Sequence, residues 1–398
     1  MRFLIAADKF KGSLSNEQVA QAIRSGIENV FSKSSLGSLN THDSFIDVVT
    51  VSDGGDGFLL AIADALADQQ HAFEIRVVEV KDAVGKEIEA DYLLDSSTNF
   101  AYVELAIASG LAQIDPADQD PLFTTTYGTG LLIRHAIENG ATRVYVGLGG
   151  SATNDAGMGI AAALGCRFLD SEGNSLLPVG DSLNRVASID ATDLIKLVPI
   201  VAVNDVTNPL YGPDGAAHVY AAQKGAAQPI IEELDQGLQN FANVVGQTFT
   251  NKKDTHLTKG TGAAGGVGYG LQVFCDATFI AGTEIIFECM DLYKRLEEDM
   301  YDIVITGEGK IDSQTAFGKV VSRVGELAYP HDVFVVAFCG INELTTEQSE
   351  ALGIGEVIAI HDPAKNSIDE TIANAEPLLA EAAEAWFQRE IDRILEEH

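Results

Sequence analysis

The chain has 398 residues, of which 46% are hydrophobic, so it can bury a large core in two domains or in one large one. Its 59 acidic residues against 25 basic ones give a formal net charge of −34, which argues against binding to nucleic acid or anionic lipid. No uncharged apolar run approaches the ~20 residues that span a bilayer, and the first residues lack the apolar region of a signal peptide. We therefore expect a cytoplasmic protein whose phosphate or carboxylate ligands are held by local amides, a metal and a few lysines.

The first part of the chain alternates strand and helix. Residues 2–7 predict a short buried strand, and Ser15 with Gln18 forms a capping box at the start of a helix. Residues 45–51 predict a second strand, which ends on the glycine-rich turn 53–57 and is followed by a second helix. Ligand-binding loops of open α/β sheets follow the carboxyl ends of strands, and both of these loops do.

Each of the two loops carries candidate functional groups. After the first strand, Asp8 is a candidate proton acceptor or Mg²⁺ ligand and Lys11 a candidate phosphate contact. In the second loop, Asp53 or Asp56 is a candidate metal ligand, and Gly55 leaves room for a ligand. The alternatives are a solvated charged loop in the first case and an ordinary Asp-Gly turn in the second.

The middle of the chain changes character. Three strand-like runs follow one another without a helix between them: 73–80, 86–94 and 100–106. Such a block predicts a mixed or antiparallel sheet, hence a second domain. Alternation of strand and helix returns in the last part, with predicted strands at 301–307, 332–340 and 355–360. We therefore predict an α/β domain of residues 1–73 and 260–398, interrupted by an inserted α/β domain of residues 74–259.

The stretch 146–165 is the centre of the functional prediction. It contains an apolar strand, a turn of small residues and a helix expected to begin near Asn154 and Asp155. The turn offers backbone N–H groups at the positive end of a helix, which suits an oxyanion. Its residues are Gly149, Gly150, Ser151, Ala152 and Thr153. The alternative is an ordinary turn with Asn154 or Asp155 as N-cap. Three further glycine-rich turns, at 53–57, 260–266 and 307–310, favour a site lined by backbone amides.

Other polar residues follow the later strands. Asp205 and Asn208 end a strong apolar strand, where they suit a metal or a substrate hydroxyl or simply form an Asx turn. Lys224 is a candidate phosphate contact. Glu104 lies inside an apolar run and must face either solvent or a cation. The densest set of functional groups follows the strand at 301–307 and consists of Glu308, Lys310, Asp312, Gln314 and Lys319.

These features favour phosphoryl transfer over other chemistry. The chain has neither a Walker loop nor a GxGxxG fingerprint that opens a βαβ unit. A phosphoryl-transfer enzyme needs phosphate cradles, a divalent metal, cations and often a carboxylate near the acceptor hydroxyl. Because the chain carries candidates for each, the residues alone predict an α/β enzyme that handles a nucleotide or phosphate. A non-catalytic module that binds a phosphorylated metabolite stays as the alternative.

The motifs together resemble those of the bacterial type I glycerate kinase family. AADKFKGSLS is similar to that family's opening APDSFKGSLS, and VSDGGDG is similar to its ADGGEG. Further motifs follow in the family's order: TTYGTG, GGSATNDAGMG, DVTNPLYGPDGA, QKGA, GAAGGVG and TGEGKIDSQTAFGK. The resemblance runs from Ala6 to about Gly340. It departs at Ala7, Lys9, Asp56 and Ala156, where the family has Pro, Ser, Glu and Gly. Lys9 puts in doubt a hydroxyl role at that position.

The resemblance implies phosphorylation of D-glycerate by ATP with Mg²⁺. It also implies a discontinuous flavodoxin-like, parallel-sheet domain into which a mixed-sheet α/β domain is inserted, with the site in the cleft between them. Members of this type mostly form 2-phosphoglycerate, but glycerate kinases that form 3-phosphoglycerate exist, so the attacked hydroxyl stays open. Another small hydroxy-acid or sugar kinase would share the chemistry, and a homo-oligomer is possible.

The chemistry of such a kinase suggests roles for the candidate residues. The phosphate-cradle and substrate candidates are Gly149, Gly150, Ser151, Thr153, Asn154, Gly262, Gly265 and Gly266, with Asp53, Gly55 and Asn208. Asp205, Glu308 and Asp312 are alternative metal ligands. Asp8, Asp205 or Asp312 would orient or deprotonate the glycerate hydroxyl. Lys11, Lys224 and Lys319 would neutralise phosphate or the substrate carboxylate.

Overall fold

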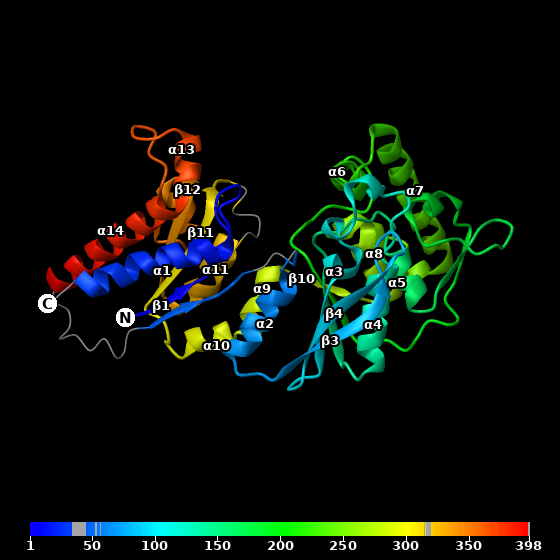
Figure 1. The fold of residues 1–398 in the computed structure, drawn as a ribbon, viewed down its shortest axis with the longest axis horizontal. Coiled ribbons are helices and arrows are strands. Elements are labelled where there is room, and N and C mark those ends of the chain that lie inside the picture. Colours follow the sequence, from blue (N-terminus) through cyan, green and yellow to red (C-terminus); the bar gives the residue numbers. More distant parts are fainter. Residues whose placement is uncertain (34–44, 52–53, 56, 314, 316–319, 397–398) are drawn as a thin grey trace. The chain divides into compact units, whose positions relative to one another are not determined.

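The chain folds into two compact units. The computed structural model describes residues 1–33, 45–51, 54–55, 57–313, 315 and 320–396. Unit 1 consists of Met1–Val51 and Ile286–His398, and unit 2 of Ser52–Ile285. Unit 2 is therefore inserted into the sequence of unit 1, as Figure 1 shows by colour.

Unit 1 is built on a five-stranded sheet in which all neighbouring strands are parallel. The strands are β1 (Arg2–Ile5), β2 (Phe45–Val48), β11 (Ile303–Ile311), β12 (Phe334–Asn342) and β13 (Glu356–Ala359). They lie in the order β13-β12-β11-β1-β2, with Ile5 of β1 paired to Ile305 and Val48. Counted within the unit, this is the 2-1-3-4-5 order of flavodoxin-like folds, so the predicted fold class is confirmed. The order reverses between β1 and β11, the place where such sheets bind ligands.

Two long helices cover one face of this sheet. Helix α1 (Asn16–Lys33) and helix α14 (Ala375–Glu396) lie side by side (Figure 1). Apolar side chains such as Phe3 and Trp386 fill the space between them and the sheet. The predicted capping box at the start of α1 is confirmed, because Ser15 and Gln18 each bond the other's backbone N–H. The other helices of this part are α10 (Leu292–Glu297), α11 (Val320–Ala328), α12 (Thr346–Glu350) and α13 (Ile368–Ala373).

Unit 2 contains a six-stranded mixed sheet in the order β10-β9-β6-β5-β4-β3. Its strands are β3 (Phe73–Lys81), β4 (Glu87–Asp95), β5 (Phe100–Glu104), β6 (Arg143–Gly147), β9 (Ile200–Val203) and β10 (Thr278–Ile280). β3, β4 and β5 pair antiparallel, whereas β5, β6, β9 and β10 pair parallel. The predicted mixed sheet is therefore confirmed. A separate hairpin pairs β7 (Arg167–Leu169) with β8 (Ser188–Asp190).

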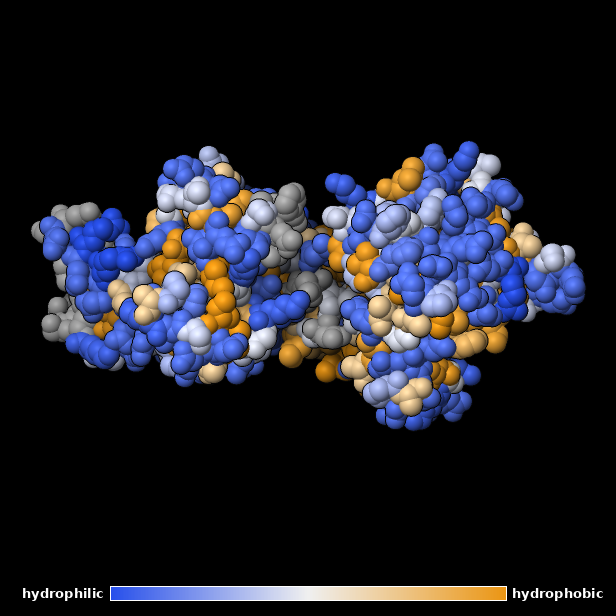
Figure 2. Space-filling model, turned by 90° about the horizontal axis from the view of Figure 1, so that it is seen from above, coloured by the Kyte–Doolittle hydropathy of each residue, from blue (hydrophilic) through white to orange (hydrophobic). Residues whose placement is uncertain are grey.

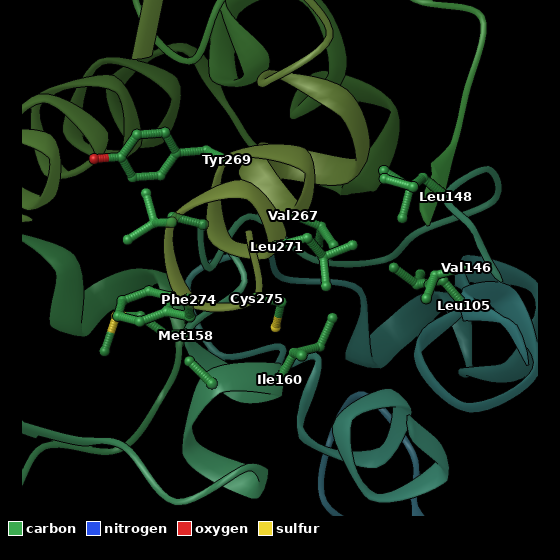
Figure 3. Close-up of a cluster of buried hydrophobic side chains, with 14 of the residues drawn as sticks. Leu105, Val146, Leu148, Met158, Ile160, Val267, Tyr269, Leu271, Phe274 and Cys275 are labelled. Carbon is green, nitrogen blue, oxygen red and sulfur yellow. The ribbon is translucent and has the colours of Figure 1, made fainter. Parts of the chain in front are cut away.

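The core of unit 2 lies between this sheet and a layer of helices. Figure 3 shows Val267 and Leu271 of helix α8 (Ala263–Phe274) directed toward side chains of the neighbouring strands and helices, including Val146 and Ile160. On the other face of the sheet, the ring of Phe58 lies against Gly147. The remaining helices are α2 (Phe58–Asp68), α3 (Leu105–Ser109), α4 (Tyr127–Glu138), α5 (Met158–Ala163), α6 (Ala216–Tyr220), α7 (Gln228–Thr248) and α9 (Gly282–Cys289).

The division of the chain differs from the boundaries expected after residues 73 and 259. Helix α2 packs against β4 and β5, and α8 packs against α5 and α6, so both flanking segments join unit 2. The boundaries differ because sequence patterns show where strands change their pairing but not which sheet a flanking helix covers.

Two local predictions are wrong. The helix expected from Asn154 begins at Met158, because Ala156 and Gly157 have left-handed backbones with φ of 53° and 72°. The expected glycine-rich turn 307–310 lies inside β11, where Glu308 pairs with Cys339 of β12. Glycine there allows close strand packing and does not end the strand.

The surface agrees with the acidic composition. Figure 2 shows mainly hydrophilic residues on the face seen from above, with small hydrophobic patches among them. Among the residues that the structure describes, every helix is too short or too polar to span a bilayer.

Candidate functional site

In unit 1, the loop after β1 lies against β11 at the point where the strand order reverses. The backbone N–H of Asp8 donates to the carbonyl oxygen of Gly307 at 2.8 Å. A Cβ at Gly309 would lie 3.1 Å from the backbone nitrogen of Lys11. These contacts fall on either side of Glu308. The structure thus brings the loop that carries Asp8 and Lys11 to the strand that carries the acidic candidates.

Glu308 and Asp312 are connected through one hydroxyl. Glu308 is buried, and its Oε1 accepts a hydrogen bond from Thr315 Oγ1. The backbone N–H of Asp312 donates to the same Oγ1 at 3.1 Å, and the N–H of Thr315 donates to the Asp312 carbonyl at 3.0 Å. Thr315 therefore links Asp312, which follows β11, to Glu308 inside that strand. The sequence analysis missed this threonine, although its spacing of three from Asp312 is a turn signal.

Lys310 adds a positive charge at the edge of this acidic group. Its Nζ lies 3.4 Å from Asp312 and 2.9 Å from Glu343. The Glu343 partner, with a smaller contribution from Asp312, raises the pKa of Lys310 above its ordinary value. Lys310 is therefore a cation held by two carboxylates.

In unit 2, Lys224 forms hydrogen bonds with the turn after β6. The Lys224 side chain is 2% exposed, and its Nζ donates to Ser151 Oγ and to the Thr153 carbonyl, each at 2.7 Å. Burial lowers the pKa of Lys224 to about 7, and the nearby Asp155 raises it in part. The sequence analysis treated Lys224 as a phosphate contact, but its observed partners belong to the protein.

Asp155 anchors the end of the same turn. It is fully buried and accepts hydrogen bonds from Thr126, Gly157 and Gly159 at 2.7 to 3.1 Å. Burial raises the pKa of Asp155, and these four hydrogen bonds oppose the rise. Two of the donors, the N–H groups of Gly157 and Gly159, lie at the start of α5, but the N-cap residue of this helix is Gly157. The alternative prediction of Asn154 or Asp155 as N-cap is therefore wrong. Asp155 also fastens the turn to the segment before α4.

Glycines let three backbone segments of unit 2 approach closely. A Cβ at Gly149 would lie 2.0 Å from the Cα of Gly55, and the Gly149 N–H donates to Gly54 O at 2.9 Å. A Cβ at Gly265 would lie 2.0 Å from the Thr153 carbonyl, and its φ is +70°. Gly266 and Gly150 are also left-handed, with φ of +89° and +69°. The structure thus brings the predicted cradle residues together, while the Gly149 amide already has a protein acceptor.

Asn208 and Asp205 organise the loop after β9. Asn208 Nδ2 donates to Asp214 O at 2.8 Å, its Oδ1 accepts from Tyr220 at 2.6 Å, and its carbonyl accepts from Gly262 N–H at 2.9 Å. Asp205 is exposed, and its Oδ1 accepts from the N–H of Gly282 at 3.2 Å. Asn208 therefore holds the loop in place, and Asp205 has one oxygen at the start of α9.

Several buried polar atoms of unit 2 have no hydrogen-bond partner in the described part of the chain. They include Thr153 Oγ1, both side-chain polar atoms of Asn154, Asn204 Nδ2 and Thr283 Oγ1. Such atoms are costly unless a ligand or ordered water satisfies them. Asn204 precedes Asp205, and Thr283 follows Gly282 in α9, so these two lie beside Asp205 in the fold. Sequence reasoning missed both, because an isolated Asn or Thr carries no signal.

The sequence analysis expected Glu104 to face either solvent or a cation, but its side chain faces backbone N–H groups. Its carboxylate is buried and accepts from the backbone N–H groups of Gly57 and Leu59 at 3.1 and 3.0 Å. These donors lie at the positive N-terminal end of α2, which stabilises a negative charge. Glu104 therefore fixes the end of the glycine-rich turn that includes Gly54 and Gly55.

Four candidate residues, Asp53, Asp56, Gln314 and Lys319, lie outside the described residues. Within the described ranges, no three His, Cys, Asp or Glu side chains form a ready-made metal cluster. Mg²⁺ in kinases is commonly held by one or two carboxylates together with substrate phosphates. The carboxylates of Glu308 and Asp312 suit such a site.

Comparisons with known proteins agree on one family. Residues 3–389 match the model of the Glycerate kinase family. The chain is 36% identical to a glycerate kinase of Halalkalibacterium halodurans over 96% of both chains, and 38% identical to the glycerate 2-kinase of Escherichia coli over 85% of both. A crystal structure of a candidate glycerate kinase 2 from Salmonella typhimurium LT2 superposes with a TM-score of 0.78 at 35% identity, covering 99% of both chains.

Proposed function

The chain belongs to the glycerate kinase family, and from that premise we propose that it transfers the terminal phosphoryl group of ATP to D-glycerate, giving 2-phospho-D-glycerate. The observation that carries the proposal is the near full-length match to named glycerate kinases, one of them a 2-kinase. The two sets of groups described above supply what phosphoryl transfer requires, namely carboxylates for a metal and cations and amides for phosphate.

In this proposal the acidic residues of unit 1 hold Mg²⁺ and handle the acceptor. Glu308 and Asp312 are the metal ligands, and bound Mg²⁺ supplies neutralisation of phosphate charge. Asp205 of unit 2 is the alternative ligand. Asp8 or Asp312 orients the glycerate hydroxyl and accepts its proton as the oxygen attacks phosphorus. Each is a carboxylate that follows a strand or ends one, where its oxygens can reach a ligand.

The cationic and glycine-rich groups hold the negative charges of the substrates. Lys11 and Lys319 neutralise a phosphate or the glycerate carboxylate. The turn from Gly150 to Asn154, with Gly265 and Gly266, surrounds an anionic group with amides and with the unpartnered polar atoms of Thr153 and Asn154. Exclusion of water from these groups strengthens their electrostatic effect and limits wasteful hydrolysis of ATP.

One coupled assay tests the proposal. Purified protein is given MgATP and D-glycerate, ADP release is followed, and the product is offered to enolase without phosphoglycerate mutase. Immediate use by enolase is the expected result. A product that needs the mutase would show a 3-kinase, and turnover only with other hydroxy acids or sugars would show a different acceptor. A folded protein that binds phosphorylated metabolites but turns over none of these acceptors would be a binding protein.

A further inference from the structure

Lys224 is a buried cation whose charge is not matched by a neighbouring carboxylate. Among the described residues no acidic oxygen lies within ion-pair distance of its Nζ, and its two hydrogen bonds go to a hydroxyl and a carbonyl. Asp155 acts on it only through space, because the Asp155 oxygens accept hydrogen bonds from other groups. A buried, uncompensated ammonium favours an anion nearby.

Ser151 is the side-chain hydrogen-bond partner of this cation. An ammonium is only a donor, so Ser151 Oγ must accept from Lys224 Nζ. The hydroxyl proton of Ser151 then points away from Lys224, and within the described residues no acceptor receives it. Ser151 is 7% exposed whereas Lys224 is 2% exposed, so Ser151 is the more accessible of the two residues.

We infer that Lys224 acts on a bound oxyanion through the Ser151 hydroxyl and does not touch the anion itself. The Ser151 O–H donates to an oxygen of a phosphoryl or carboxylate group, and the ammonium behind it makes that hydroxyl a stronger donor. Ser151 is thus the contact residue and Lys224 a positioning residue, which also fixes the turn through the Thr153 carbonyl. This inference rests on the proposed kinase function and deepens it.

The inference has a consequence for pH. Burial lowers the pKa of Lys224 to about 7, so the ammonium is progressively lost as the pH rises above neutrality. Asp155 is the charged group that faces Lys224 among the described residues. The Asp155 side chain is buried and hydrogen-bonded, and burial raises its pKa. A neutral Lys224 amine would no longer polarise Ser151.

The first experiment compares pH profiles of the intact protein and two serine variants. In the native protein, kcat/KM for one of the two substrates should fall at least about tenfold between pH 7 and 9, because this parameter reports the free enzyme. In Ser151→Ala the value at pH 7 should already be low and the profile nearly flat. Ser151→Thr keeps a hydroxyl and should restore the slope. Separate profiles for ATP and for D-glycerate show whether the oxyanion is a phosphate or the carboxylate.

A double-mutant cycle gives the second test. If Lys224 acts through Ser151, replacing Ser151 by Ala in a Lys224→Met background should change kcat/KM less than twofold, although each single change costs tenfold or more. Ser349→Ala is the control for loss of a buried serine hydroxyl, since the Ser349 hydroxyl donates to the backbone carbonyls of Thr345 and Thr346 at the start of α12 in unit 1.

The opposite results would overturn the inference. A pH slope that persists in Ser151→Ala, or losses that multiply in the double variant, would mean that Lys224 touches the anion directly. If Lys224→Met does not fold, the serine profiles still decide. An inactive native protein would contradict the proposed function, whereas an active one with a persistent slope would contradict only the role of Ser151.

Discussion

Each unit contains a buried charged side chain that is bonded to a hydroxyl, and the two charges are opposite in sign. In unit 1 the Glu308 carboxylate is buried, and in unit 2 the Lys224 ammonium is buried. Each forms a hydrogen bond with a neutral hydroxyl, from Thr315 in the first case and Ser151 in the second. A hydroxyl group therefore positions a buried charged side chain in both units.

The two units differ in how far apart in the sequence the charged residue and its hydroxyl partner lie. Thr315 is seven residues from Glu308, whereas Ser151 is 73 residues from Lys224. The acidic group is thus assembled locally at the end of one strand. The cationic group needs the fold of unit 2 to bring the turn after β6 against the short segment after α6. We therefore expect substitutions in the acidic group to lower mainly the activity. Substitutions in the cationic group should lower both the activity and the free energy of unfolding.

The largest effect is expected from Asp312→Asn in unit 1. The change removes a charge that would hold Mg²⁺ or accept the proton, so kcat should fall by a factor of about 100 or more. The free energy of unfolding should change little, because Asp312 bonds Thr315 through its backbone. Steady-state kinetics with MgATP and D-glycerate, together with urea denaturation, measure both quantities.

Glu343→Gln is the matched control for that change. Glu343 also pairs with Lys310, but its side chain is more exposed than that of Asp312. The control should keep near-normal turnover. If Asp312→Asn also turns over normally as a folded protein, Asp312 is neither base nor metal ligand, and the acidic group of unit 1 loses its proposed role.

The next effect concerns stability against pH in unit 2. The Lys224 pKa of about 7 lies below its ordinary value of 10.5, so between these values the unfolded chain binds a proton that the folded chain does not. Stability therefore rises with pH in this window, by up to about 1 kcal/mol per pH unit from this group. Urea denaturation at pH 7, 8 and 9 should show this slope in the native protein and a smaller one in Lys224→Met.

Lys365→Met serves as the comparison, because Lys365 is an exposed lysine that pairs with Asp362 on the surface. This variant should keep the native slope. Equal slopes in all three proteins would show that Lys224 keeps an ordinary pKa. The proposed contrast between Lys224 in unit 2 and Glu308 in unit 1 would then be wrong.

Sequence reasoning reached the features that depend on neighbouring residues. The capping box at Ser15, the parallel strands of unit 1 and the mixed sheet of unit 2 all follow from short-range patterns, and the structure confirms them. It also grouped Asp312 with Glu308, because they are four residues apart; Glu308 lies inside β11 and Asp312 directly follows that strand.

It did not reach the features that depend on distant contacts. The start of α5 moved to Met158 because Ala156 takes a left-handed backbone where it meets Gly265 across the fold, and nothing near Ala156 signals this. The internal use of Lys224 likewise follows from contacts with residues far along the chain. Glycines at 307 and 309 looked like a turn, since a sequence does not show that a strand continues through them.

A third change separates a structural carboxylate from the proposed functional ones. In Glu104→Gln, the amide NH2 would face a backbone N–H of α2, so one charge-assisted hydrogen bond is lost and two donors oppose each other. The free energy of unfolding should fall by about 2 kcal/mol. Urea denaturation measures it, with Glu138→Gln as an exposed helical control expected near zero. A loss no greater than in the control would mean that Glu104 does not stabilise α2.

The smallest effect concerns backbone strain beside the cationic group. Ala264 and Ala156 both have left-handed backbones, with φ of 54° and 53°. An alanine in this conformation destabilises the folded state by roughly 1–2 kcal/mol. Replacement by glycine removes this strain, but it costs about 0.4–1 kcal/mol because glycine gives the unfolded chain more conformational freedom. Ala264→Gly, at a partly exposed site, should therefore stabilise the protein by about 0.5–1 kcal/mol in urea denaturation.

Ala156→Gly relieves the same strain but also removes a fully buried methyl group, worth about 0.8 kcal/mol, so its net effect should be close to zero. Ala263→Gly is the matched control, because this buried neighbour has no left-handed backbone and should lose about 1 kcal/mol. A loss in Ala264→Gly equal to that in Ala263→Gly would show that the segment is not strained. The left-handed residues at 264–266 would then reflect the glycines alone and not the docking of this segment against the turn that Lys224 holds.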